Sequence, residues 1–155
     1  MKTWLNDNYK NYAIFTVIAL FLKFVSFQVG SDFLDTFLQD NLIVLLPALL
    51  AINVTTLSIM LTKINDLKKA YKQVSFKNVI DGMKQSVLEQ VLLIVLSVVI
   101  LILRSSKNIS FLSSQDGQNI LGIVLIVCAS AALHTVIDTA NALFSFLTTE
   151  DEITQ

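Results

Sequence analysis

Five polar side chains share one face of the last apolar segment of the sequence. They are spaced by 4, 4, 3 and 4 residues, which aligns side chains along a helix: Ser130, His134, Asp138, Asn141 and Ser145. His134 and Asp138 stand one helical turn apart, so their imidazole and carboxylate can hydrogen-bond and exchange protons near neutral pH. Ionisable residues inside a membrane span are costly and usually face a bundle interior or a water-filled cavity. The stripe therefore indicates either the lining of a proton- or ion-sensitive pore or a polar seam with a neighbouring helix.

Three further polar residues lie inside the other apolar segments: Lys23, Asn53 and Glu89. Counting depth at about 1.5 Å per residue places Lys23 and Asn53 near the bilayer midplane, together with Ser130. The same count places Glu89 nearer the lysine-rich side of the membrane, with His134. The alternatives are that Lys23 extends outward to the membrane surface and that Glu89 is an ordinary interfacial acid. Pore lining and helix seam both stay open at this point.

Long apolar runs must position these groups. Of 155 residues, 54% are hydrophobic and 15% charged, with a mean hydropathy of +0.69, whereas roughly a quarter of the residues of a soluble domain are charged. The runs are continuous and show no strand-like alternation, which indicates helices that satisfy their own backbone hydrogen bonds in lipid. We predict four spans, at residues 12–29, 42–61, 87–103 and 120–140. Lys23 in mid-segment and the lack of a cleavage pattern argue against a signal peptide.

The charges between the spans predict the orientation. Residues 30–41 carry three aspartates and no base, whereas residues 62–86 carry most of the basic charge. Six lysines lie in that second segment: Lys63, Lys68, Lys69, Lys72, Lys77 and Lys84. The positive-inside bias then places this segment in the cytoplasm, together with both termini and the acidic tail at 148–155. Apolar residues recur at helical spacing within 62–86, so we predict a cytoplasmic helical hairpin that extends spans two and three.

These features predict one all-α domain, a four-helix transmembrane bundle over residues 1–155. A hydrolase needs a nucleophile, a base and an orienting group at one site, and His134 with Asp138 supplies too few of them. A metal site built from histidine and cysteine needs several such ligands, and the sequence has one of each. It also has no glycine-rich loop of the kind that binds phosphate. We therefore expect no enzymatic activity, no metal or cofactor and no direct contact with nucleic acid.

The layout resembles the RexB-type phage-exclusion proteins. The resemblance covers the four short spans, the basic loop, Glu89 at the start of the third span, His134 in its small-residue setting, and the ending at 147–152. The membrane subunits of other two-gene anti-phage systems, such as Kiwa, have a similar layout. The resemblance implies a bacterial inner-membrane effector that permeabilises or depolarises the membrane when a soluble cytoplasmic partner senses infection. Asp138 and Asn141 lie outside the resemblance.

Two classes of function follow from this pattern. The first is a homo-oligomeric, ion-conducting protein, because four helices from one chain enclose too little space for a wide pore. The second is an anchor or sensor that does not conduct and whose lysine-rich hairpin binds a soluble partner or anionic lipid, at about 1 kcal/mol per lysine near the surface. A small-molecule transporter is a third possibility, but the sequence shows none of the inverted repeats typical of that class.

Overall fold

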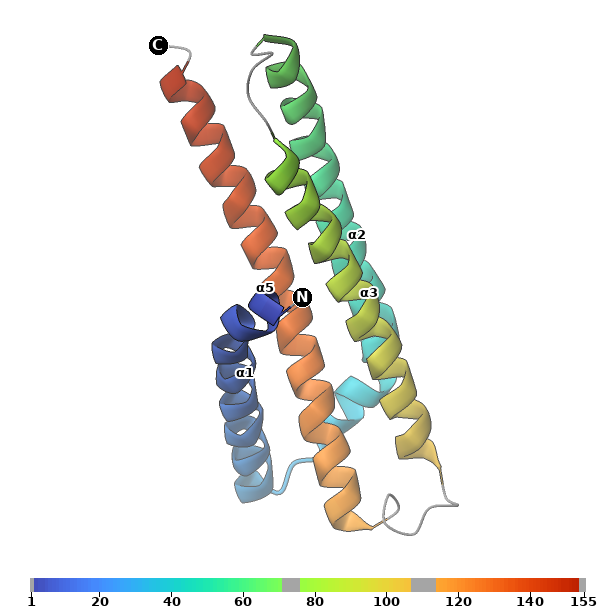
Figure 1. Cartoon of the computed structure of the whole chain (residues 1–155). Helices are drawn as coiled ribbons and strands as arrows, with labels where there is room; N and C mark the ends of the chain where they lie inside the picture. The colour runs from blue at the N-terminus through green and yellow to red at the C-terminus, as the bar shows by residue number, and fades with distance from the viewer. Residues whose placement is uncertain (1, 71–75, 107–113, 154–155) are drawn as a thin grey trace.

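Long helices make up the part of the protein that the structure describes. The computed structural model describes residues 2–70, 76–106 and 114–153, and side chains within 12–69, 76–106 and 114–145. The helices are α1 (Lys2–Val29), α2 (Phe33–Ala70), α3 (Lys77–Ser105) and α5 (Gln115–Ile153), and these ranges contain no strand. Figure 1 shows them as an elongated bundle. The predicted all-α four-helix bundle is confirmed.

All four helices are long and apolar enough to cross a bilayer. The candidate spans cover Tyr12–Val29, Phe33–Lys69, Lys77–Ser105 and Gln115–Ser145, with mean hydropathies between 1.9 and 2.7. Large apolar side chains also lie on the outside of the bundle, and on α3 they form a band from Leu88 to Ile102. Such a surface is unfavourable in water but suits contact with lipid tails. The chain is a multi-pass membrane protein.

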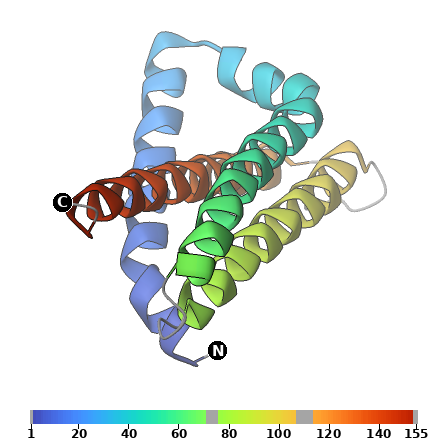
Figure 2. The ribbon, with the colours of Figure 1, turned by 90° about the horizontal axis from the view of Figure 1, so that it is seen from above.

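The central helix of the bundle is α5. It packs against α1, α2 and α3, while α2 and α3 also pack against each other. Figure 2 shows α5 passing between α1 and the α2–α3 pair. Leu42, Leu93 and Leu125 are buried where these helices meet, and the small side chains of Ala19 and Ala132 are buried with them. Small residues let membrane helices approach closely, which explains how one helix can contact three others.

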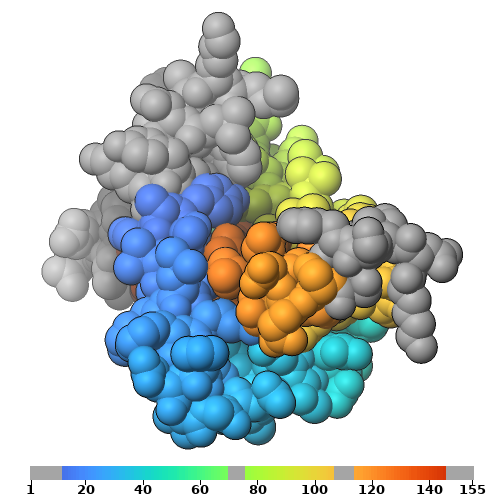
Figure 3. Space-filling view, turned by 90° about the horizontal axis from the view of Figure 1, so that it is seen from below, coloured from blue at the N-terminus to red at the C-terminus, as the bar shows by residue number. Residues whose placement is uncertain are grey.

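The two ends of the bundle differ in shape. We call the end where α2 finishes and α3 starts the hairpin end, and the end with the α1–α2 turn the far end. Figure 1 shows that α1 starts about halfway along α5 and covers only the far half, and that α5 diverges from the α2–α3 pair toward the hairpin end. In Figure 3, seen from the far end, the start of α5 (orange) lies against α1 (blue) and the first part of α2 (light blue to cyan). The far end is therefore closely packed, whereas the hairpin end is splayed.

Helix α2 starts earlier than the predicted second span. The sequence indicated a loop at 30–41, but α2 starts at Phe33, directly after a short turn. Gly30 in that turn has φ +64°, a backbone conformation that glycine adopts easily. Pro47 lies inside α2, and Figure 2 shows the first turns of the helix running at an angle to the remainder. A proline removes a helical hydrogen bond and bends a helix, which accounts for the change of direction.

The helices also extend beyond the predicted spans at the hairpin end. α2 continues past residue 61 to Ala70, and α3 starts at Lys77, ten residues before the predicted third span. The connection at 71–75, which includes Lys72, lies outside the described residues. α5 contains the predicted fourth span and continues to Ile153, so most of the expected tail at 148–155 is helical. The cytoplasmic location of these extensions stays a prediction.

Candidate functional site

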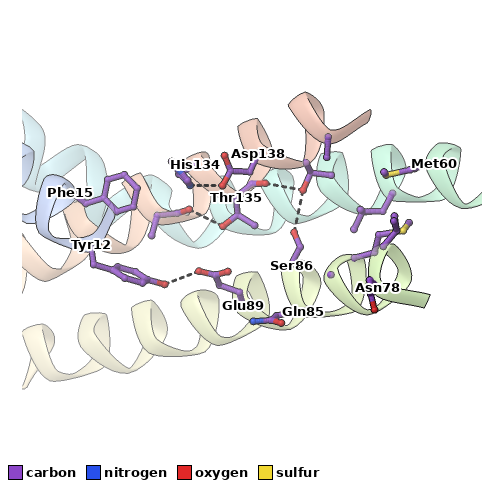
Figure 4. Close-up of a pocket in the computed structure, with 17 residues that line it drawn as sticks. Tyr12, Phe15, Met60, Asn78, Gln85, Ser86, Glu89, His134, Thr135 and Asp138 are labelled. Atoms are coloured by element: carbon purple, nitrogen blue, oxygen red, sulfur yellow. Dashed lines mark hydrogen bonds and ion pairs between the residues drawn. The ribbon is translucent and has the colours of Figure 1, made fainter. Parts of the chain in front are cut away.

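A polar cleft opens toward the hairpin end of the bundle (Figure 4). Its volume is about 440 Å³, and all four helices contribute to its lining. The polar residues that line it are Tyr12, Asn78, Gln85, Ser86, Glu89, His134, Thr135, Asp138 and Thr139. The cleft forms because α1 covers only the far half of α5 while α5 itself diverges from α2 and α3.

On the α3 side of the polar cleft, Glu89 is held by Tyr12. The Tyr12 hydroxyl donates a hydrogen bond of 2.7 Å to Glu89 Oε1, which connects α1 to α3. The Tyr12 ring packs edge-on against Phe15, with ring centroids 6.1 Å apart. Sequence reasoning singled out Glu89 but missed Tyr12, because a tyrosine at the start of a span is also typical of a membrane interface.

On the α5 side, His134 and Asp138 form an ion pair or hydrogen bond along one helix. His134 Nδ1 lies 3.0 Å from Asp138 Oδ2, and the two side chains are 33% and 61% exposed. The Phe15 ring packs edge-on against the imidazole, with centroids 5.2 Å apart. Figure 4 shows His134 and Asp138 across the cleft from Glu89. The cleft therefore gathers two carboxylates and one imidazole, the groups used in proton and cation paths.

The cleft reaches into the membrane-spanning part of the helices. Glu89 lies fifteen residues before Arg104, or roughly 22 Å along α3 from the far end, and Asp138 lies twenty residues after Gln118, or roughly 30 Å along α5. The hydrocarbon core of a bilayer is about 30 Å thick. With the far-end charges at one membrane surface, Glu89 lies inside the core and Asp138 lies at its opposite edge.

A buried amide network lies beside the cleft and joins α2, α3 and α5. Asn53 Nδ2 donates to Gln90 Oε1 at 2.9 Å and to Ser86 Oγ at 3.0 Å. Gln90 Nε2 donates to the Ala132 carbonyl at 3.3 Å, and the Ser86 and Thr139 hydroxyls are 3.2 Å apart. Asn53 is fully buried and Gln90 is 2% exposed. Asn53, predicted as a pore or seam residue, thus lies in a helix seam. Gln90 was not singled out from the sequence, although an amide side chain inside the third span was a signal that could have identified it.

At the far end, an ionic cluster connects all four helices. We give this name to Lys23 on α1, Asp35 on α2, Arg104 on α3 and Gln118 on α5. Lys23 Nζ lies 2.5 Å from Asp35 Oδ2, and Arg104 Nη2 lies 3.1 Å from Asp35 Oδ1. Arg104 Nε donates to Gln118 Oε1 at 3.1 Å, and Gln118 Nε2 donates to the Arg104 carbonyl at 3.1 Å. The three charged side chains are at most 19% exposed, so one carboxylate serves two largely buried cations.

The prediction that Lys23 shares a midplane layer with Asn53 is wrong. Asp35 belongs to the first turns of α2 rather than to a loop, and the α1–α2 turn brings it back against Lys23. A buried ammonium group requires a counter-charge, and Asp35 is within its reach. Asn53 instead lies beside Gln90, fourteen residues or roughly 21 Å along α3 from Arg104. The expected layer is therefore divided between the ionic cluster and the amide network.

The polar stripe predicted on α5 is divided as well. Ser130 is half-buried and Asn141 is exposed, and neither residue lines the cleft. Thr135 and Thr139, each one position after a member of the stripe, are buried and line it instead. Their hydroxyls donate to the carbonyls four residues before them, at 3.0 and 2.9 Å. The spacing of the stripe identified a helix face, but it did not determine how far that face is rotated from the bundle interior.

The described lysines of the predicted hairpin lie outside the cleft. Lys63 is half-buried, and four others are exposed: Lys68, Lys69, Lys77 and Lys84. Lys69 forms an exposed pair with Asp66 at 3.4 Å. Lys84 and Lys77 lie roughly 30 and 40 Å along α3 from Arg104. These side chains therefore lie at or beyond the membrane edge, where a soluble partner or lipid headgroups can reach them.

Within the ranges that the structure describes, no group of three or more His, Cys, Asp or Glu side chains is arranged to hold a metal ion. Comparison with family models, with characterised proteins and with solved structures finds no match for this chain. Function must therefore be inferred from the polar cleft, the amide network and the ionic cluster themselves.

Proposed function

We propose that the chain conducts ions across a membrane and that the polar cleft is part of the ion path. The observation that supports this most directly is that Glu89, His134 and Asp138 line one cleft between four helices that are long and apolar enough to span a bilayer. Such groups are costly inside a span and usually belong to an ion or proton path. The ionic cluster and the amide network already connect the helices, so a further set of ionisable residues is not needed for assembly.

The resemblance drawn from the sequence supplies a setting for this proposal. It would place the protein in a bacterial inner membrane, with the hairpin end in the cytoplasm. A soluble partner that senses phage infection would release conduction, and the resulting depolarisation would halt phage growth. Large apolar side chains are exposed along α1, such as Phe21 and Phe24, and they offer contact surface to lipid or to further copies of the chain. Homo-oligomerisation is part of this proposal.

A voltage measurement on reconstituted protein tests conduction. Vesicles containing the full chain receive a potassium diffusion potential set by valinomycin, and a voltage-sensitive dye reports its decay. We expect the wild-type protein to collapse the potential, and Glu89→Gln combined with His134→Ala to slow the collapse by about tenfold or more, because charged lining groups control ion entry. Asn141→Ala is the matched control, since Asn141 is exposed on the same helix and does not line the cleft. Wild-type vesicles as tight as empty ones would contradict the proposal.

The lysines at the hairpin end support a second candidate function, a membrane anchor that binds a soluble partner without conducting. Lys68 and Lys69 are exposed near the end of α2, beyond the apolar part of that helix. Charge reversal by Lys68→Glu and Lys69→Glu should then remove a partner that co-purifies with the protein from its host. An unchanged set of co-purifying proteins would count against this function.

A further inference from the structure

Polar residues recur every seven positions along the inward side of α3. Gln90, Ser97 and Arg104 follow one another at this spacing, which is close to two helical turns. Gln90 and Ser97 are 2% and 1% exposed, and the Arg104 side chain is 11% exposed. Leu93 and Ile100 are buried between them. The bundle therefore contains a row of polar groups from the amide network, through Ser97, to the ionic cluster.

Polar atoms without a hydrogen-bond partner occur along this same row. Among the described residues, three buried side-chain atoms lack a hydrogen bond of standard geometry: Asn53 Oδ1, Ser97 Oγ and Arg104 Nη1. Ser97 Oγ has the Cys128 thiol beside it, which is only a weak hydrogen-bonding group. Leaving such an atom unpaired costs about 1–3 kcal/mol, and a membrane span offers no lipid group to replace the bond. They lie near Gln90, at Ser97 and at Arg104, or roughly 21, 10 and 0 Å along α3 from the cluster. Atoms spaced about 10 Å apart cannot share one partner, so each needs its own, and water is the small molecule that satisfies buried acceptors and donors alike.

The row starts at the polar cleft. Ser86 and Thr139 line the cleft, and Ser86 accepts a hydrogen bond from Asn53. Beyond Asn53 the row is enclosed by Leu93, Leu125 and Cys128, each 8% exposed or less. A sodium or potassium ion would have to shed its water shell among these apolar side chains, whereas a proton moves by hopping along hydrogen-bonded hydroxyls and single water molecules.

We propose that a single-file thread of water extends from the polar cleft past Asn53 to Ser97 and that the ion carried is the proton. This inference rests on the proposed conduction and names its ion. Glu89, His134 and Asp138 line the cleft at the entrance of this thread. Each hop inward breaks one O–H bond and forms the next, so no other reactant is needed.

The ionic cluster forms the electrostatic barrier at the far end of the thread. Lys23 and Arg104 carry two positive charges against the single negative charge of Asp35. The remaining positive charge opposes the exit of a proton at this point. Lys23→Met would leave Asp35 and Arg104 as a neutral pair, and we expect it to raise proton flux by about fivefold or more.

Thiol exchange tests the water thread directly. Cys128 is the single cysteine of the chain and lies beside Ser97, so Cys128→Ala, which adds no polar group there, provides a background in which one new thiol can be followed. The infrared S–H band of Ser97→Cys is monitored after transfer of the reconstituted protein into D₂O, with Ile100→Cys as the control, since Ile100 is also buried on α3. We expect the Ser97→Cys thiol to exchange at least about tenfold faster, because exchange at the control requires local opening of the helix packing. Equal rates at the two positions would overturn the thread.

Ion selectivity tests the proton assignment separately. Proteoliposomes that carry opposite gradients of protons and potassium, in a medium with a membrane-permeant anion that balances the charge moved, are followed with a pH-sensitive dye and a potassium electrode. We expect the wild-type protein to release the proton gradient while retaining potassium, and Lys23→Met to release it faster. Potassium release alongside protons would overturn the proton assignment while leaving the proposed conduction standing. Retention of both ions would overturn the conduction and the proton assignment together, and the thiol experiment would still decide whether the thread exists.

Discussion

The far end and the hairpin end of the bundle use similar residues in opposite ways. At the far end, each charged side chain of the ionic cluster bonds to a residue on another helix, and the four helices are held together. At the hairpin end, His134 pairs with Asp138 on its own helix, and the Tyr12–Glu89 bond crosses the polar cleft. Charges that connect helices stabilise an arrangement, whereas charges along a splayed cleft stay exposed to water and ions. The difference separates a structural end from a candidate functional end.

Removing the carboxylate of the ionic cluster should have the largest effect. Asp35→Asn leaves Lys23 and Arg104 largely buried without a counter-charge, and the expected loss of stability is about 3 kcal/mol. Thermal unfolding of the purified protein in detergent measures it. Asp40→Asn, an exposed position on the same helix, serves as the control. An unchanged midpoint for Asp35→Asn would mean that the cluster does not hold the far end together.

Alanine substitutions at two glycines should change the stability of the protein in opposite directions. A Cβ at Gly122 would lie 2.7 Å from Asp35 Oδ1 and 3.0 Å from Lys23 Cε, whereas a Cβ at Gly82 would meet nothing within 4 Å. Gly122→Ala should therefore destabilise the protein by about 1–2 kcal/mol, because Asp35 is fixed by two cations. Gly82→Ala should stabilise it by about 0.5 kcal/mol through helix propensity. The same unfolding assay distinguishes them, and equal shifts would show that the far end is no more tightly packed than the hairpin end.

The hydrogen bond between Tyr12 and Glu89 should contribute less to the stability of the protein than the ionic cluster does. Tyr12→Phe removes the hydroxyl that donates to Glu89 and keeps the ring that packs on Phe15. We expect a loss of about 1 kcal/mol, since Glu89 can turn to the water of the cleft. Denaturant titration of the reconstituted protein measures the change. A loss as large as that of Asp35→Asn would place Tyr12 and Glu89 among the structural pairs instead.

Loss of the exposed ion pair near the end of α2 should have the smallest effect on stability. Lys69 and Asp66 lie 3.4 Å apart with side chains 80% and 64% exposed. Lys69→Ala should change stability by less than about 0.5 kcal/mol, because solvent screens such pairs. A midpoint shift comparable to that of Tyr12→Phe would show that the hairpin is stabilised by its surface charges rather than by packing.

Much of the fold was predictable from the sequence because long apolar runs admit few alternatives. The four helices and their extension toward a hairpin follow from continuous hydropathy and helical spacing. The ionic cluster was not predictable, since Asp35 and Arg104 both lie outside the predicted spans, in segments interpreted as loops. Pairing across four helices depends on the rotation of each helix about its axis and on where α2 starts. The spacing of residues within one helix determines neither of these.

The candidate site was predictable in part for the same reason. Glu89, His134 and Asp138 line the cleft, and each was singled out as an ionisable residue within or beside a span. Ser130 and Asn141 were selected with them by spacing alone, although the inward side of α5 passes through Thr135 and Thr139. A rotation of one residue position separates the predicted face from the observed one, and only packing against the other helices sets that rotation.

The most direct test of the division between the two ends measures conduction and stability on the same two variants. Glu89→Gln changes the polar cleft, and Asp35→Asn changes the ionic cluster. Vesicle depolarisation and thermal unfolding are recorded for both variants and for the wild-type protein. We expect Glu89→Gln to slow depolarisation and keep its unfolding midpoint, since a glutamine can still accept the Tyr12 hydrogen bond, and Asp35→Asn to lose stability. A Glu89→Gln variant that depolarises vesicles as fast as the wild type would contradict the assignment of the cleft as the ion path.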